Sequence, residues 1–371
     1  MECLHASQHQ HGSGYHRRRV IFFHRAADRK IRRKKIGGIY LIAGGCAVIW
    51  FGYLNSIAAF FLCLVILWVF TDGYGQMSPQ TLTTNWFPRK KGIALGWSTM
   101  GYPVCTIITV SLLTTLIGVL GYGKAFLALG VVHVCLGFLT LFAIHDYPEE
   151  VGAYPDNDST GLDDLKAMLE YRKNYKSELT VKKLLTDKNM WAIAVMMGLL
   201  WMCTIGIVSQ MVPRLTSIGY SQTMATHCMQ FSSIVGIIGS YFYGWLDQKI
   251  GTRKSVMIYC WGYVAVFLLF IFNNTTTGLI LACGIAGTGT GAICNLLPSY
   301  IGTVYGRDDF AIANSIIYPI ASMIRCLNFT ILAIGLNMTG TYTPSSVIFC
   351  VFAIIAFFMA VKLKAVYQEK E

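Results

Sequence analysis

Two ionisable side chains inside long apolar stretches are the residues best suited to chemistry. Asp72 lies midway along residues 57–84, and Arg325 lies near the middle of residues 309–337. A charge within an apolar span is costly, so such groups are candidates for binding, proton transfer or ion pairing. A guanidinium holds a carboxylate through two parallel hydrogen bonds. Arg325 is therefore the expected contact for an anionic ligand.

Polar residues at helical spacing surround both charges. Tyr318 and Asn314 precede Arg325 by seven and eleven residues, which at 3.6 residues per turn places all three within about 20° of one helix face. Gln76 follows Asp72 by one turn. These residues predict the lining of a cavity, in which Asp72 is the candidate carrier of a coupling proton.

A structural alternative stays open for these residues. Asp72 and Arg325 could form an ion pair that only holds helices together, or each could pair with backbone groups. Other chemistry finds no support in the sequence, because the cysteines occur singly without a C-x-x-C pair and no nucleophile set or nucleotide loop is present. We expect no metal, no cofactor and no enzymatic activity.

Composition identifies the surroundings of these side chains as lipid. The 371 residues are 54% hydrophobic and 13% charged, about half the charged fraction of soluble domains. Ten apolar stretches have lengths near the ~20 residues that cross a bilayer. They cover residues 36–54, 57–84, 92–120, 124–145, 189–212, 221–246, 255–272, 275–305, 309–337 and 341–361. The fold class predicted is an all-α integral membrane protein with about ten transmembrane helices.

The net charge of +12 is an orientation signal. If the ten stretches alternate across the bilayer, most Lys and Arg residues lie on one side, which the positive-inside rule makes cytoplasmic. The prediction is a multi-pass protein of the cell membrane with both termini in the cytoplasm. Its partner is the lipid bilayer, and nucleic acid is not expected.

An internal repeat divides the chain into two related halves. Residues 28–35 match residues 247–254, and Pro79 matches Pro298 at the same offset. The second half has six stretches and the first only four, because residues 1–27 carry five His and four Arg and cannot cross lipid. We expect 1–27 to be an anomalous leader, 28–145 an incomplete bundle that lacks its first two helices, 146–188 a cytoplasmic loop, and 189–371 a six-helix bundle with a short tail.

These features resemble the major facilitator superfamily. The segment from Gly244 to Lys254 is similar to its signature loop, of which the first half keeps only residues 28–35. The resemblance implies a two-bundle fold and a breakable ion network that holds one access state; the alternative is that these charges only orient the protein. The candidate gating residues are Asp28, Arg32, Arg33, Asp247, Arg253 and Lys254.

Two loops, residues 85–96 and 147–155, resemble the oxalate/formate antiporter family. That likeness implies a secondary transporter of a small organic anion, with a proton or counter-anion as the coupled species. We expect the protein to be a monomer. Oxalate transporters of that family use two membrane cations, and the position of the second here falls near Ser240. A monocarboxylate is therefore favoured over oxalate. The alternative function is a truncated, non-transporting membrane protein or a receptor derived from a transporter.

Overall fold

The computed structural model describes residues 33–159, 165–175, 177, 179–272 and 275–363, and this part of the chain is helical with no strand. The predicted leader 1–27 lies outside the described residues. The elements of the first half and central loop are α2 (Arg33–Phe51), α3 (Ile57–Asp72), the π-helix η1 (Gly73–Met77), α4 (Ser78–Trp86), α5 (Lys91–Thr99), α6 (Gly101–Leu120), α7 (Tyr122–Ala143), η2 (Pro148–Val151), η3 (Pro155–Asn157), α8 (Leu165–Asn174) and α9 (Val181–Thr186). The second half has α10 (Lys188–Ser217), α11 (Gln222–Ile250), α12 (Thr252–Phe272), α13 (Thr276–Thr339) and α14 (Thr343–Lys362).

Helices cover most of each predicted membrane span, although α2 and α11 are not among those that are long and apolar enough to cross a membrane. Within the described residues, seven helices are long and apolar enough to cross a membrane. The longest, α13, is interrupted at Gly306, whose φ of 71° and ψ of −179° are not helical, so that it makes two passes. Each of the ten predicted stretches is largely helical, and two of them, 57–84 and 92–120, extend over more than one helical element. The all-α membrane fold class is therefore confirmed.

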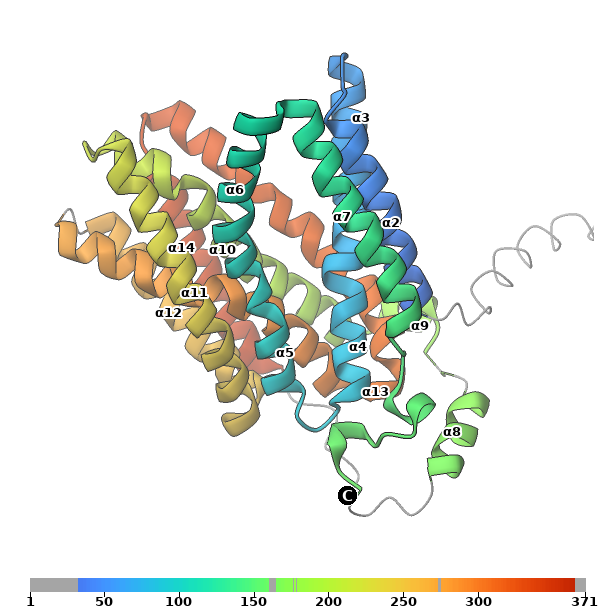
Figure 1. Ribbon diagram of the computed structural model, residues 1–371. Helices are drawn as coiled ribbons and strands as arrows, with labels where there is room; N and C mark the ends of the chain where they lie inside the picture. The colour runs from blue at the N-terminus through green and yellow to red at the C-terminus, as the bar shows by residue number, and fades with distance from the viewer. Residues whose placement is uncertain (1–32, 160–164, 176, 178, 273–274, 364–371) are drawn as a thin grey trace, which may run out of the picture.

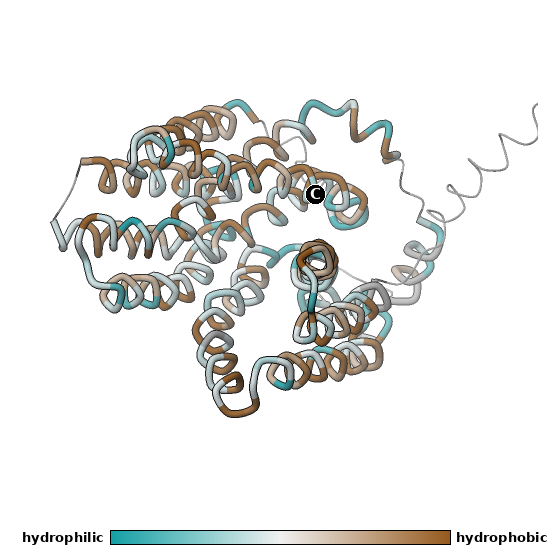
Figure 2. Tube along the Cα trace, turned by 90° about the horizontal axis from the view of Figure 1, so that it is seen from above, coloured by the Kyte–Doolittle hydropathy of each residue, from teal (hydrophilic) through white to brown (hydrophobic). Residues whose placement is uncertain are grey.

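Two groups of helices lie side by side (Figures 1 and 2). One group contains α2 to α7 and the other contains α10 to α14. Hydrophobic residues run along most helical turns of both groups (Figure 2). Many of these side chains are exposed, as Phe142 is at 80%, which suits a surface in contact with lipid.

The two groups approach each other closely where α5 crosses α11. A methyl group added at Gly244 would lie 2.6 Å from the carbonyl oxygen of Gly92 and 2.8 Å from Cα of Gly96. The two backbones therefore touch, and only glycine fits between them.

Gly244→Ala should consequently force α5 and α11 apart. We expect a loss of stability of about 1–3 kcal/mol, as for other overpacked positions, measured as a lower temperature of thermal unfolding in detergent. Gly262→Ala is the matched control, because its added methyl group would have no neighbour closer than 3.7 Å. Equal unfolding temperatures for the two variants would contradict the assignment of a tight crossing.

Candidate functional site

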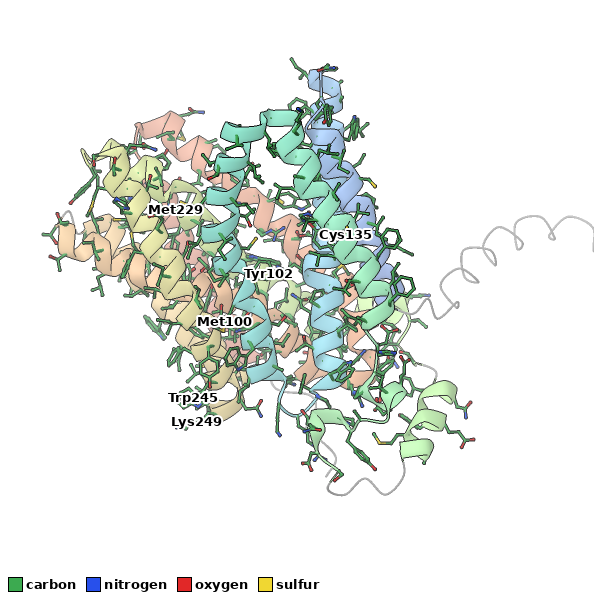
Figure 3. All side chains as sticks on the ribbon, in the orientation of Figure 1. Met100, Tyr102, Cys135, Met229, Trp245 and Lys249 are labelled. Atoms are coloured by element: carbon green, nitrogen blue, oxygen red, sulfur yellow. The ribbon has the colours of Figure 1, made fainter. Side chains whose placement is uncertain are left out.

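A cavity of about 450 Å³ lies between the two helix groups. From Asp72 and Arg325 it extends along the earlier residues of α3, from Leu64, and along the later residues of α10, as far as Met211. Met229, another lining residue near the start of α11, lies toward the end of the molecule opposite Lys249 (Figure 3). The cavity thus runs from the two charges away from the end of the molecule where Lys249 lies.

Asp72 and Arg325 face each other at the inner part of this cavity. Nη2 of Arg325 lies 3.7 Å from Oδ2 of Asp72, longer than a hydrogen bond. The carboxylate instead accepts hydrogen bonds from the Tyr318 hydroxyl at 3.0 Å and, more weakly, from Ser322 at 3.4 Å. Arg325 donates to Ser322 at 2.8 Å. Ser322 therefore bridges an acid and a base that make no direct hydrogen bond.

A π-helical turn places Asp72 at the cavity. The turn η1, Gly73–Met77, directly follows Asp72 and interrupts the span Ile57–Trp86. The hydroxyl of Tyr102, on α6, donates to the carbonyl oxygen of Gly75 within this turn. Single π-turns of this kind are frequent at functional sites.

The other two predicted site residues belong to a neighbouring amide network. Gln80 donates to Gln76 Oε1 at 2.7 Å, and Asn314 donates to Gln80 Oε1 at 3.4 Å. Gln76 lines the cavity, whereas Asn314 is buried behind it at 1% exposure. The structure thus places Gln76 near Asp72. Asn314 is connected to Gln76 only through Gln80.

Basic residues gather at the end of the molecule that carries Lys249, which we call the basic face. It is formed by Arg89 to Lys91, the described residues of the loop 146–188, residues 249–254 and Arg307. The two helix groups are joined here: Gln248 donates to the carbonyl oxygen of Arg89 at 2.9 Å, and Lys91 donates to Thr303 at 2.8 Å. These bonds close the basic face below the cavity.

A buried ion pair adds to this closure. Arg307, which follows the break at Gly306, donates to the two oxygens of Glu149 at 2.9 and 3.3 Å and also to the carbonyl oxygen of Asn85. The Glu149 side chain is fully buried and that of Arg307 is 13% exposed. The loop after α7 is thereby attached to the middle of α13.

The predicted gating residues do not form one network in the described part of the chain. Asp247 is buried and accepts from Ser299 at 2.5 Å, with its carboxylate beside the first turn of α5, where a negative charge is stabilised. Arg253 lies elsewhere and donates to the last carbonyl groups of α14. Lys254 is exposed. Asp28, Arg32 and the side chain of Arg33 lie outside the described residues.

Comparison with known proteins assigns the family. The family model described as Major Facilitator Superfamily matches residues 20–327. The chain belongs to the major facilitator superfamily. Among solved structures of the superfamily, it resembles the fucose–proton symporter of Escherichia coli with a TM-score of 0.65 and 12% identity over 89% of this chain and 82% of that one. A proton–xylose symporter aligns with a TM-score of 0.69 and 12% identity over 91% and 81% of the respective chains.

Curated relatives align over shorter lengths. The oxalate:formate antiporter of Oxalobacter formigenes is 23% identical over 275 residues, which are 73% of this chain and 60% of that protein. The galactose–proton symporter of E. coli is 30% identical over 118 residues, 30% of this chain and 24% of that protein. This member of the superfamily thus spans less than two thirds of either relative. The superfamily and the structures it resembles are transporters, not enzymes.

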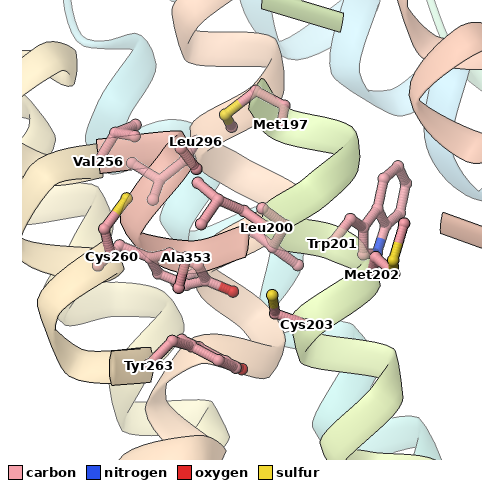
Figure 4. Packing of buried hydrophobic residues seen from close by; sticks show 14 of the residues in the cluster. Met197, Leu200, Trp201, Met202, Cys203, Val256, Cys260, Tyr263, Leu296 and Ala353 are labelled. Atoms are coloured by element: carbon pink, nitrogen blue, oxygen red, sulfur yellow. The ribbon is translucent and has the colours of Figure 1, made fainter. Parts of the chain in front are cut away.

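Two tryptophans flank the guanidinium of Arg325 in this member of the superfamily. The sequence pattern did not predict them. The guanidinium of Arg325 lies 4.2 Å from the ring of Trp201 and 5.2 Å from that of Trp68. Figure 4 shows Leu200 within the packing of α12 and α14 while Trp201 points to the other side of α10. Ser322 was also missed, although its position three residues before Arg325 is a usable signal. The tryptophans lie on other helices, and no spacing reveals them.

Proposed function

We propose that this chain is a secondary transporter of a small organic anion, with a monocarboxylate as substrate, working by alternating access in the cell membrane. The observation that carries the proposal is Arg325 paired with Asp72 inside a cavity between the two helix groups. In this superfamily, substrates bind at that interface near the middle of the membrane. We take the basic face, with both termini, to be cytoplasmic.

The long Asp72/Arg325 contact suggests how a proton is coupled to the anion. Asp72 neutralises Arg325 from 3.7 Å without a direct hydrogen bond, so a substrate carboxylate could replace it as the counter-ion. Two carboxylates beside one guanidinium would repel each other. Protonation of Asp72 removes that repulsion, and we infer that proton and anion bind together.

Known relatives support both parts of this proposal. The oxalate:formate antiporter carries carboxylates by its name, and the galactose–proton symporter couples its substrate to protons by its name. The basic-face loop 147–155, part of the likeness to the antiporter family, supplies Glu149 for the pair with Arg307. In this proposal, the closed basic face corresponds to one of the two access states.

Uptake into proteoliposomes tests the transport activity. We expect saturable uptake of labelled lactate by the full chain when an inward proton gradient is imposed, and no uptake of labelled galactose. Lys124→Gln, which removes an exposed positive charge at the start of α7, is the control and should transport at the same rate. Uptake of galactose but not lactate would instead indicate a sugar transporter.

Asp72→Asn should separate anion movement from proton movement. The amide preserves shape and the hydrogen bond from Tyr318 but is permanently neutral, as protonated Asp72 would be. We expect lactate exchange between equal internal and external pools to continue, while a proton gradient no longer drives accumulation. If this variant still accumulated lactate in response to a proton gradient, Asp72 would not be the carrier of the coupled proton.

A further inference from the structure

The cavity is larger and less polar than a very small acid needs. Its volume of about 450 Å³ lies in the range of sites for molecules of drug size. Most of its wall is apolar, contributed by side chains such as Leu64, Leu67, Ile205, Val208 and Met211. A one-carbon or two-carbon acid at Arg325 would leave that wall facing water, whereas a larger apolar body would cover it favourably.

Arg325 has donors to spare for a ligand. Its hydrogen bond to Ser322 uses Nη2, and within the described residues neither Nε nor Nη1 makes a hydrogen bond. A carboxylate bound there would lie beside the rings of Trp68 and Trp201, which are within cation–π distance of the guanidinium. Trp68 is 51% exposed and lines the cavity, so it can contact the apolar body attached to the carboxylate.

The charges of the wall limit the ligand to a single carboxylate. Among the described residues that line the cavity, Asp72 carries the only carboxylate and Arg325 the only cationic group. A second carboxylate would find no second cation, and it would approach the charge of Asp72.

We propose that the substrate is a monocarboxylate with an aromatic or similarly large apolar body, an arylalkanoic acid rather than formate or oxalate. This inference rests on the proposed function and adds the substrate class. Arg325 binds the carboxylate of the substrate. Trp68 and the aliphatic side chains of the wall contact its apolar body and favour substrates in which that body is large.

Ligand protection of the purified full chain in detergent tests the substrate class. Thermal unfolding is followed with increasing formate, lactate, oxalate, 3-phenylpropionate or 3-phenylpropionamide, because a ligand of the folded state raises the unfolding temperature according to its affinity. We expect 3-phenylpropionate to bind at least about tenfold more tightly than the three small acids, and the neutral amide to protect little.

Variants of Trp68 identify the selecting residue. Trp68→Leu should weaken 3-phenylpropionate by about 5- to 10-fold, the size of an aromatic contact, and leave lactate unchanged, while Trp68→Phe should recover most of the loss. Trp261→Leu is the control, since Trp261 is exposed and packs on Phe357 away from the cavity.

Each outcome is decisive. Equal affinity for lactate and 3-phenylpropionate, or an equal loss for both with Trp68→Leu, overturns the aromatic substrate while leaving the anion transporter intact. Equal protection by the acid and its amide, unchanged in Arg325→Gln, overturns the anion site itself and with it the proposed function. Preference for oxalate over both monocarboxylates overturns the single-carboxylate inference.

Discussion

Arg325→Gln is expected to reduce carboxylate uptake by about 100-fold or more. The variant removes the positive charge of the cavity wall, and with it the hydrogen-bonded charge pair proposed between Arg325 and the substrate carboxylate. Loss of one partner of such a buried pair commonly costs about 2–5 kcal/mol. The same loss leaves Asp72 without its counter-charge, so thermal stability should fall as well. Uptake of labelled 3-phenylpropionate and lactate into proteoliposomes measures the first effect.

A double variant separates binding from stability. Asp72→Asn combined with Arg325→Gln has no uncompensated charge, so we expect its unfolding temperature to return toward that of the wild type while its uptake stays abolished. Arg325→Lys keeps the charge but loses the planar fork, and should retain weak uptake. If the double variant regained uptake together with stability, Arg325 would have only the structural role left open by the sequence.

Glu149→Gln is expected to loosen the closure of the basic face. The ion pair with Arg307 is almost fully withdrawn from solvent, and breaking such a pair costs about 3–5 kcal/mol because one charge is left buried. We expect amide hydrogen exchange to become at least about tenfold faster in residues 85–92 and 146–157, as measured by mass spectrometry. Population of the state open at this face should rise accordingly.

The neighbouring acid provides a matched control. Glu150 is exposed, next to Glu149 in the same short helix η2, and Glu150→Gln changes the net charge by the same amount. We expect its exchange rates to equal those of the wild type. Similar acceleration in both variants would mean that surface charge, not the pair with Arg307, keeps the face closed.

The sequence predicted the helices and the charged pair because both depend on local or simple rules. A span needs only apolar length, so every predicted stretch is largely helical. Asp72 and Arg325 were found because a charge in lipid requires a partner, and Tyr318 because it shares the face of Arg325. The structure adds that Tyr318 donates to Asp72 rather than standing beside Arg325 alone.

The rest depends on contacts between residues far apart in the chain. In the sequence, Arg307 is one of many basic residues that could orient the protein, because no nearby residue indicates Glu149 as its partner. Trp68 and Trp201 are ordinary members of apolar spans until two helix groups bring both beside one guanidinium. Arg253 was assigned from the likeness of its loop, and only packing shows that it lies at the end of α14.

The π-helical turn Gly73–Met77 fixes the register between the two parts of its span. A π-turn accommodates one residue more than an α-helical turn, and each residue rotates an α-helix by about 100°. If one residue of the turn were deleted, a regular helix would rotate Ile57–Asp72 by that angle relative to Ser78–Trp86. Trp68 and Asp72 would then leave the cavity together while Gln80 stayed in place. This one irregular turn thus aligns the predicted proton carrier and the proposed selecting ring with the same guanidinium.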